Sequence, residues 1–238
     1  MSSIDFRYGR LDAQSQRGGS QIMRATILSG GGQYSDPWHP FAETSAAIAE
    51  ILGDAGFTVA VREDVEDAAA DLGAVDLIVA NAAAGPESDK RGPARAGVLK
   101  FLENGGGVLA IHVGASGLVG IPEWEQITGM AWVEGSGHPP VGPSRLLLDA
   151  AVHPIAAHLH DFELVDERYS NLRLAPDLAP FVFHDLDGVR HPLVWTRSYG
   201  LGRVVVDTLG HDARSFGSQE HRLLIDRSAR WVTRQPLR

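Results

Sequence analysis

The chain has 238 residues, 44% of them hydrophobic and 21% charged, and is therefore long enough to bury one substantial core. A formal net charge of −9, without any run of lysine or arginine, argues against nucleic-acid binding because no patch would neutralise phosphates. The chain contains no cysteine, which excludes thiol nucleophiles, and no apolar stretch near the roughly 18–20 residues of a membrane span.

Residues 1–22 differ in composition from the rest of the chain. Serine, glutamine and glycine dominate there, with little apolar periodicity, so we expect a flexible extension outside the functional site. The segment also lacks the charged, apolar and small regions of a secretory leader, which favours a cytoplasmic protein without a membrane partner. Residues 23–238 are expected to form a single α/β domain.

The first half of the chain alternates short apolar runs with helical patterns. Residues 76–80 are apolar almost without interruption, which is typical of a parallel sheet covered on both faces. This alternation predicts a flavodoxin-like, doubly wound, mostly parallel sheet. We expect strands over 24–29, 57–61, 75–80 and 108–111, and helices over 40–53 and 91–103.

The second half of the chain follows a different pattern. Short or alternating apolar runs separated by turns indicate mostly antiparallel strands added at one edge of the sheet. An amphipathic pattern over 219–232 predicts a closing helix. We also expect a short helix over 122–128 and strands over 145–148, 162–165, 192–195 and 203–207.

Glycine and polar residues follow several of the predicted parallel strands. Gly30–Gly32, Asn81, His112 and Gly210–His211 each stand at such an end. Open parallel sheets bind ligands at the carboxyl ends of their strands, so these groups should converge on one rim. The triple glycine lacks both the G-x-G-x-x-G spacing and the lysine of a P-loop, so we expect no nucleotide cofactor.

His112 directly follows the apolar run 108–111. This strand-to-turn position resembles the nucleophile elbow of α/β enzymes, which pushes one side chain above the sheet. An imidazole there can act as a base or as a metal ligand near neutral pH.

Two adjacent acids, Asp166 and Glu167, follow the predicted strand over 162–165. Successive side chains of an extended chain point to opposite sides, so only one of them can readily enter a site. We take Glu167 as the candidate base and Asp166 as the residue that bonds locally. A solvated acidic turn is the alternative.

The other histidines of interest are dispersed along the chain. His39, His138 and His211 show no H-E-x-x-H spacing, so no local metal motif exists. Distant loops can still assemble a catalytic zinc or manganese site, with His112, His138 and His211 as the candidate ligands. We expect His158, His160, His184 and His221 to be ordinary surface or capping residues.

Several ordered motifs together resemble the trehalose-utilisation ThuA-like family, which is related in fold to class I glutamine amidotransferases. The resemblance runs from about Met23 to Trp231. The motifs are His39-Pro40-Phe41, Ile111-His112-Val113-Gly114, Gly137-His138-Pro139, His153-Pro154-Ile155, Asp166-Glu167-Arg168-Tyr169, His191-Pro192-Leu193-Val194-Trp195, Tyr199-Gly200-Leu201-Gly202-Arg203 and Leu209-Gly210-His211-Asp212.

The resemblance implies a carbohydrate-catabolic enzyme acting on a keto sugar, either a 3-keto-disaccharide or a 3-keto-glycoside. His112 would occupy the region where amidotransferases keep their cysteine, so glutaminase activity is not expected. Proton abstraction beside the ketone would lead to isomerisation or elimination. The candidate catalytic residues are His112, Glu167 and His211, and the candidate sugar-binding residues are Trp38, His39, Asp166 and Tyr169.

Two other functions fit the same sequence. One is a non-catalytic sugar-binding or regulatory protein, and the other is a metal-dependent glycoside hydrolase. The fold alone does not choose among them. In each case the expected partner is a small sugar, and self-association as a homo-oligomer stays open.

Overall fold

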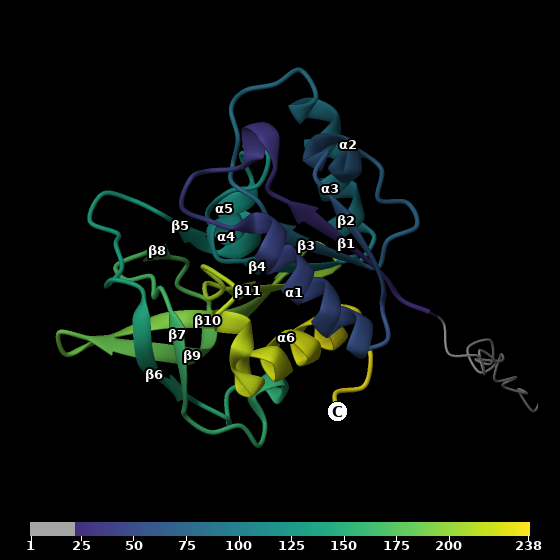
Figure 1. Ribbon diagram of the computed structural model, residues 1–238. Coiled ribbons are helices and arrows are strands. Elements are labelled where there is room, and N and C mark those ends of the chain that lie inside the picture. Colours follow the sequence, from purple (N-terminus) through teal and green to yellow (C-terminus); the bar gives the residue numbers. More distant parts are fainter. Residues whose placement is uncertain (1–21) are drawn as a thin grey trace, which may run out of the picture.

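The computed structural model describes residues 22–238, which form a central sheet with helices on both faces (Figure 1). The nine strands of this sheet have the order β2-β1-β3-β4-β11-β10-β9-β6-β7. The first five pair in parallel in the flavodoxin order, as predicted. These parallel strands are β1 (Arg24–Ser29), β2 (Thr58–Arg62), β3 (Leu77–Asn81), β4 (Gly107–Ile111) and β11 (Gly202–Asp207).

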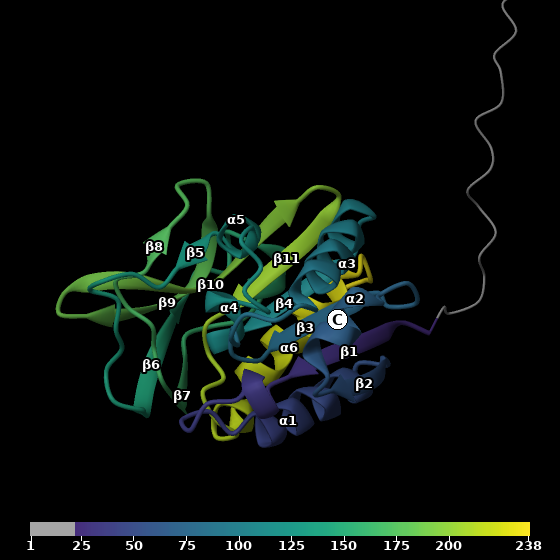
Figure 2. The same ribbon diagram turned by 90° about the horizontal axis from the view of Figure 1, so that it is seen from above.

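The remaining strands of the large sheet are antiparallel, which confirms the predicted additions at one edge. They lie at the opposite end of the molecule from β2 (Figure 2). The sequence did not predict β9, in which Pro180, His184 and Asp185 interrupt the apolar run. The antiparallel strands are β6 (Gly142–Leu148), β7 (Phe162–Asp166), β9 (Ala179–Leu186) and β10 (Val189–Tyr199), and a separate pair consists of β5 (Met130–Ala131) and β8 (Arg173–Leu174).

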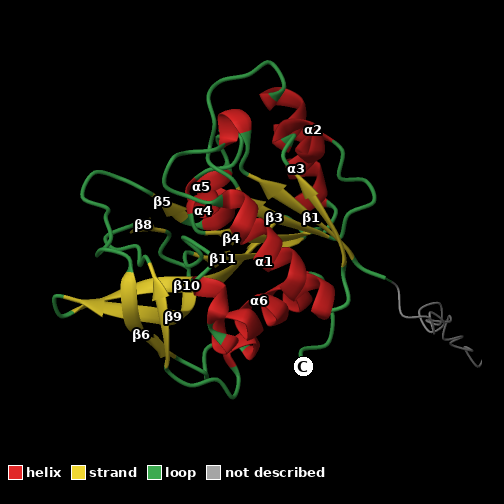
Figure 3. Ribbon diagram, viewed as in Figure 1, coloured by secondary structure: helices red, strands yellow, loops and turns green. Residues whose placement is uncertain are grey.

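Helices cover both faces of the parallel strands (Figure 3). On one face, α1 (Phe41–Asp54) and α6 (Gln219–Val232) pack against side chains such as Ile27 and Val205. On the other face, α3 packs against side chains such as Ile78 and Val108. The helices of this second layer are α2 (Val65–Ala70), α3 (Arg91–Glu103), α4 (Val113–Ser116) and α5 (Trp124–Thr128). The short α2 was not predicted.

The connection between β4 and α4 is a sharp elbow at His112. The residue has φ 46° and ψ −119°, a conformation that is costly for a residue other than glycine. Its backbone N–H donates to the Asp207 carbonyl over 2.8 Å, which ties the elbow to the end of β11. Gly114 makes the turn possible, because a Cβ there would overlap the Ala80 carbonyl oxygen on β3. The elbow therefore presents His112 at the carboxyl ends of the parallel strands, as predicted.

The extension predicted for residues 1–22 lies almost entirely outside the described residues, which begin at Ile22. Within residues 22–238, no helix is both long and apolar enough to span a membrane.

We expect Gly114→Ala to destabilise the protein by about 1–3 kcal/mol, the usual cost of overpacking a filled site. Gly92→Ala in α3 is the control, since a Cβ there meets no atom within 4 Å. It should be neutral or stabilising by about 0.5–1 kcal/mol. Denaturant unfolding of both variants measures the difference, and equal stabilities would contradict the packing assigned to the elbow.

Candidate functional site

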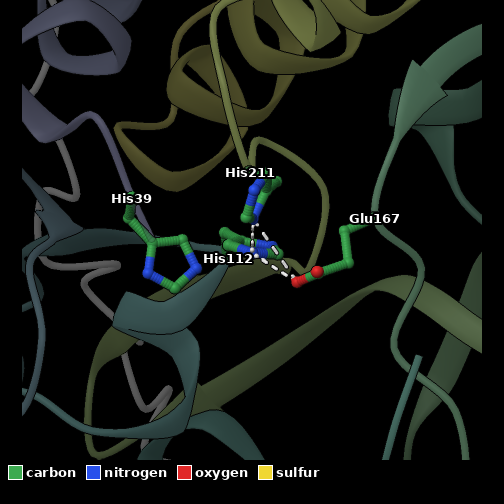
Figure 4. Close-up of side chains that lie close together, drawn as sticks. All are labelled: His39, His112, Glu167 and His211. Atoms are coloured by element: carbon green, nitrogen blue, oxygen red, sulfur yellow. Dashed lines mark hydrogen bonds and ion pairs between the residues drawn. The ribbon is translucent and has the colours of Figure 1, made fainter. Parts of the chain in front are cut away.

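Four side chains from distant parts of the chain meet at the carboxyl ends of the parallel strands: His39, His112, Glu167 and His211 (Figure 4). Each offers one ligand atom, and these atoms all lie within 4.8 Å of one another. His39 precedes α1, His112 follows β4, Glu167 follows β7 and His211 follows β11. The cluster therefore lies at the predicted rim. Glu167 reaches it from the end of the antiparallel strand β7.

The His112 ring is fixed in one tautomer. Its Nδ1 lies 2.8 Å from the Thr208 carbonyl oxygen, which can only accept, so Nδ1 carries the hydrogen. Nε2 is therefore the ring atom that faces the cluster, and it lies 3.3 Å from Glu167 Oε2 and 3.3 Å from His211 Nδ1. The residue is buried.

His39 is oriented by a carboxylate. Its Nδ1 lies 2.7 Å from Asp36 Oδ2, so Nδ1 is the donor. Its Nε2 is buried and has no hydrogen-bond partner among residues 22–238. Burial lowers the pKa of His39, and nearby His112 lowers it further, so the ring is neutral at neutral pH and Nε2 holds a free lone pair.

Glu167 links the cluster to the surface. Its Oε2 lies between His112 and His211, while Oε1 lies 2.9 Å from Nδ1 of the partly exposed His138. Burial alone would raise the pKa of Glu167, but the three histidines outweigh it and bring the pKa below its usual value. The carboxylate is therefore ionised at neutral pH.

The donor set fits a divalent transition metal such as zinc or manganese. Imidazole and carboxylate groups are suitable ligands for these ions. In metal sites the second ring nitrogen usually donates to a carboxylate or a backbone carbonyl, as Nδ1 does in both His39 and His112. The unpartnered buried Nε2 of His39 is the observation that favours a metal over a self-contained hydrogen-bond network.

The structure changes the predicted ligand set in part. It brings His112 and His211 together, as expected, and adds His39 and Glu167. His138 lies outside the cluster of ligand atoms and contacts the outer oxygen of Glu167.

Aromatic side chains surround the cluster. The Tyr169 ring lies 4.6 Å from that of His112, and Trp132 packs edge-on against Tyr169 at 4.9 Å. Burial, reinforced by Glu167, raises the pKa of Tyr169 well above its ordinary value, so the phenol stays neutral. Trp38 is 72% exposed beside His39. Trp132 is 42% exposed, whereas Tyr169 is only 4% exposed and packs behind His112, so it does not offer the open surface expected of a sugar-binding residue.

Asp166 lies beneath the cluster and is 1% exposed. Its carboxylate accepts from the backbone N–H groups of Glu167, Gly210 and His211 and from the Ser215 hydroxyl. This agrees with the expectation that Asp166 bonds locally, and it leaves the carboxylate no open face for a sugar.

Sequence reasoning missed the role of Asp36 and the burial of two histidines. The contact of Asp36 with His39 could have been recognised, because Asp36 stands only three residues before His39 in the sequence. His184 and His221 were expected at the surface or in caps, but they are 1% and 0% exposed. For His221 the signal was helical spacing: it precedes Leu224, Ile225 and Ser228 on the buried side of α6.

Comparisons with known proteins agree with this fold. A ThuA-like protein from Parabacteroides merdae superposes with a TM-score of 0.75 at 19% identity, over 90% of both chains. One from Bacteroides uniformis gives 0.70 at 19% identity over 95% of both chains. A cytoplasmic protein from Salmonella typhimurium LT2 gives 0.60 at 12% identity, over 88% of this chain and 99% of that one. No curated protein matches the chain.

The family model named ThuA and described as trehalose utilisation matches residues 24–232, a range that contains all four residues of the cluster. The chain therefore belongs to the ThuA family.

Proposed function

We propose that the protein is a carbohydrate-catabolic enzyme that removes a proton beside the ketone of a keto sugar. The substrate class is a 3-keto-disaccharide or 3-keto-glycoside, and the outcome is isomerisation or elimination. The observation that carries this proposal is an ionised carboxylate, Glu167, held against two imidazoles that face a potential metal position. The carbohydrate role of the family supports the substrate class.

The chemistry needs two groups that this site can supply. A ketone at C3 of a sugar acidifies the hydrogens on C2 and C4. Removal of one gives an enediolate, which is reprotonated elsewhere or expels a leaving group at the β position. The reaction requires a base at the C–H bond and positive charge or a hydrogen-bond donor at the oxygen.

His39, His112 and His211 are the residues that would hold a divalent metal. Three protein ligands are the usual number in catalytic zinc sites. A bound divalent ion supplies Lewis-acid stabilisation of negative charge on the ketone oxygen. The hydrogen bonds of His39 and His112 to Asp36 and Thr208 hold both rings in the tautomer that ligation requires.

Glu167 is then free to act as the base. Nδ1 of His138 lies 3.1 Å from the Pro139 carbonyl oxygen and 2.9 Å from Glu167 Oε1. This contact lies at the outer oxygen of the carboxylate and leaves Oε2 facing the cluster as the atom that accepts the proton. In this proposal the exposed Trp38 and Trp132 contact the faces of the sugar, and Tyr169 is buried behind His112.

The same proposal places the enzyme in the cytoplasm. The similar Salmonella protein is described as cytoplasmic, which supports this location.

Glu167→Gln tests the assignment of the base. The amide is a poor base of similar shape, so exchange of C2 or C4 hydrogens of a 3-keto-glucoside in D2O should fall by about 100-fold or more, the scale of general-base catalysis. Affinity for Co2+, measured by absorption spectroscopy, should stay close to wild type. Glu163→Gln, at the exposed position of β7, is the matched control. Loss of Co2+ binding in Glu167→Gln would contradict the base assignment and make Glu167 a ligand.

His112→Ala tests the assignment of His112 as a ligand. Removal of a central imidazole should weaken Co2+ binding by more than about 100-fold, beyond the usual effect of losing an outer partner of a ligand. Turnover should also be lost, while far-UV circular dichroism stays native. His160→Ala, at an exposed position, is the control. Full activity of His112→Ala would overturn the site.

A further inference from the structure

A continuous chain of buried polar side chains lies directly beneath the cluster. Ser215 Oγ lies 2.5 Å from Asp166 Oδ2 and 2.8 Å from His221 Nδ1, and His221 Nε2 lies 3.1 Å from Asp207 Oδ2. All four residues are at most 1% exposed. This network of hydrogen-bonded side chains connects the end of β7 with the end of β11 through η3 (Ser215–Gly217) and α6. We call the network the buried relay; it consists of Asp166, Ser215, His221 and Asp207.

The hydrogen bonds determine the charge state of His221. Nδ1 also lies 3.2 Å from the Ser215 carbonyl oxygen, which can only accept, so Nδ1 carries a hydrogen. Nε2 faces the Asp207 carboxylate and carries a hydrogen as well. The ring is therefore an imidazolium that contacts the Asp207 carboxylate directly, and the Ser215 hydroxyl donates a hydrogen bond to Asp166. Burial alone would lower the pKa of His221, but Asp207 and then Asp166 outweigh it and raise the pKa.

Each end of the buried relay accepts hydrogen bonds from backbone N–H groups next to or within the cluster. At one end, Asp166 Oδ1 accepts from the N–H groups of Glu167 and His211 over 2.7 and 3.1 Å, and Oδ2 accepts from Gly210 over 2.7 Å. One carboxylate thus fixes the distance between the proposed base and a proposed ligand.

At the other end, Asp207 Oδ1 accepts from the Leu209 N–H over 3.1 Å, in the turn that leads to His211. The backbone carbonyl of Asp207 accepts from the His112 N–H. A shift of either end of the buried relay would therefore move His112, Glu167 and His211 relative to one another.

From this arrangement we propose that His221 and Ser215 are positioning residues: they lock Asp166 and Asp207 so that Glu167, His112 and His211 converge on one divalent-cation position. The inference rests on the proposed function. A buried ionic network is weak evidence for stability, because desolvation offsets most of its attraction, and hydrophobic residues of similar volume often serve as well. Preorganisation of the cluster is a use that apolar residues cannot supply.

The test compares two buried serines. Ser215→Ala removes the hydroxyl that joins His221 to Asp166. Ser228→Ala, on α6, is the matched control, because Ser228 is 1% exposed and its Oγ makes no hydrogen bond within residues 22–238. The probe is Co2+ alone, titrated by absorption spectroscopy, and thermal melting of both variants controls for global stability.

We expect Ser215→Ala to weaken Co2+ binding by about 10- to 100-fold, the usual effect of losing an outer partner of a ligand. Ser228→Ala should bind Co2+ as wild type does. Hydrogen exchange at the Gly210 and His211 amides should accelerate in Ser215→Ala only. Wild-type affinity in Ser215→Ala, or an equal loss in Ser228→Ala, would overturn the inference.

Failure of the proposed metal site can be told apart from failure of this inference. If the wild-type protein binds no Co2+, the metal proposal fails, and amide exchange alone decides the positioning role. If the Gly210 and His211 amides stay protected from hydrogen exchange in Ser215→Ala, the positioning role is refuted. If they lose protection in Ser215→Ala and not in Ser228→Ala, the positioning role is upheld.

A second variant tests the charge of His221 directly. Asp207→Asn can keep every hydrogen bond of the buried relay if His221 becomes neutral, with the amide donating to Nε2 and accepting from Leu209. Long-range 1H–15N spectra at neutral pH should show two protonated ring nitrogens in wild type and one in Asp207→Asn. An unprotonated His221 nitrogen in wild type would contradict the imidazolium assignment.

Discussion

The site depends on the contact between the ends of β4 and β11. Two hydrogen bonds hold it: the His112 N–H reaches the Asp207 carbonyl, and His112 Nδ1 reaches the Thr208 carbonyl. The first stabilises a backbone conformation that is costly by itself, and the second selects the tautomer. Strand pairing thus determines both the position of His112 and the chemistry open to it.

Electrostatics organises both the cluster and the buried relay. In the cluster, burial keeps His39 neutral, and the histidines around Glu167 keep its carboxylate ionised. This combination suits a set of metal ligands beside a base. In the buried relay, the His221 imidazolium contacts the Asp207 carboxylate directly and is joined to the Asp166 carboxylate through the Ser215 hydroxyl. The buried relay and the cluster meet at Asp166. Its side chain belongs to the buried relay, and its backbone continues into Glu167. Rigid support of this kind is what a site with several convergent ligands needs.

Local signals explain how much of the fold the sequence predicted. Continuous apolar strands and regular strand–helix alternation identified the parallel half and its flavodoxin order. The sequence analysis did not predict β9, because Pro180, His184 and Asp185 interrupt its apolar pattern. It also missed the short elements α2, α4, β5 and β8, which are two to six residues long.

The site was partly predictable for a similar reason. His112 and His211 each follow a parallel strand, so topology predicts that they can meet. Glu167 follows the antiparallel strand β7, and the rule for parallel strands does not bring it to the same rim. The pairing of His39 with Asp36 and the burial of His221 depend on tertiary packing between distant segments. No spacing rule in the sequence distinguishes His138, which contacts the outer oxygen of Glu167, from the histidines of the cluster.

The most direct measurement is proton NMR of a 3-keto-glucoside in D2O with the wild-type protein, before and after treatment with a chelator. Proton abstraction beside the ketone predicts deuterium entering C2 or C4, and a role for a divalent ion predicts that chelation stops the exchange. Ligand line-broadening without exchange or product would contradict the enzymatic function and favour a sugar-binding protein. Free monosaccharide released from an unoxidised disaccharide, with incorporation of water oxygen, would instead identify a glycoside hydrolase.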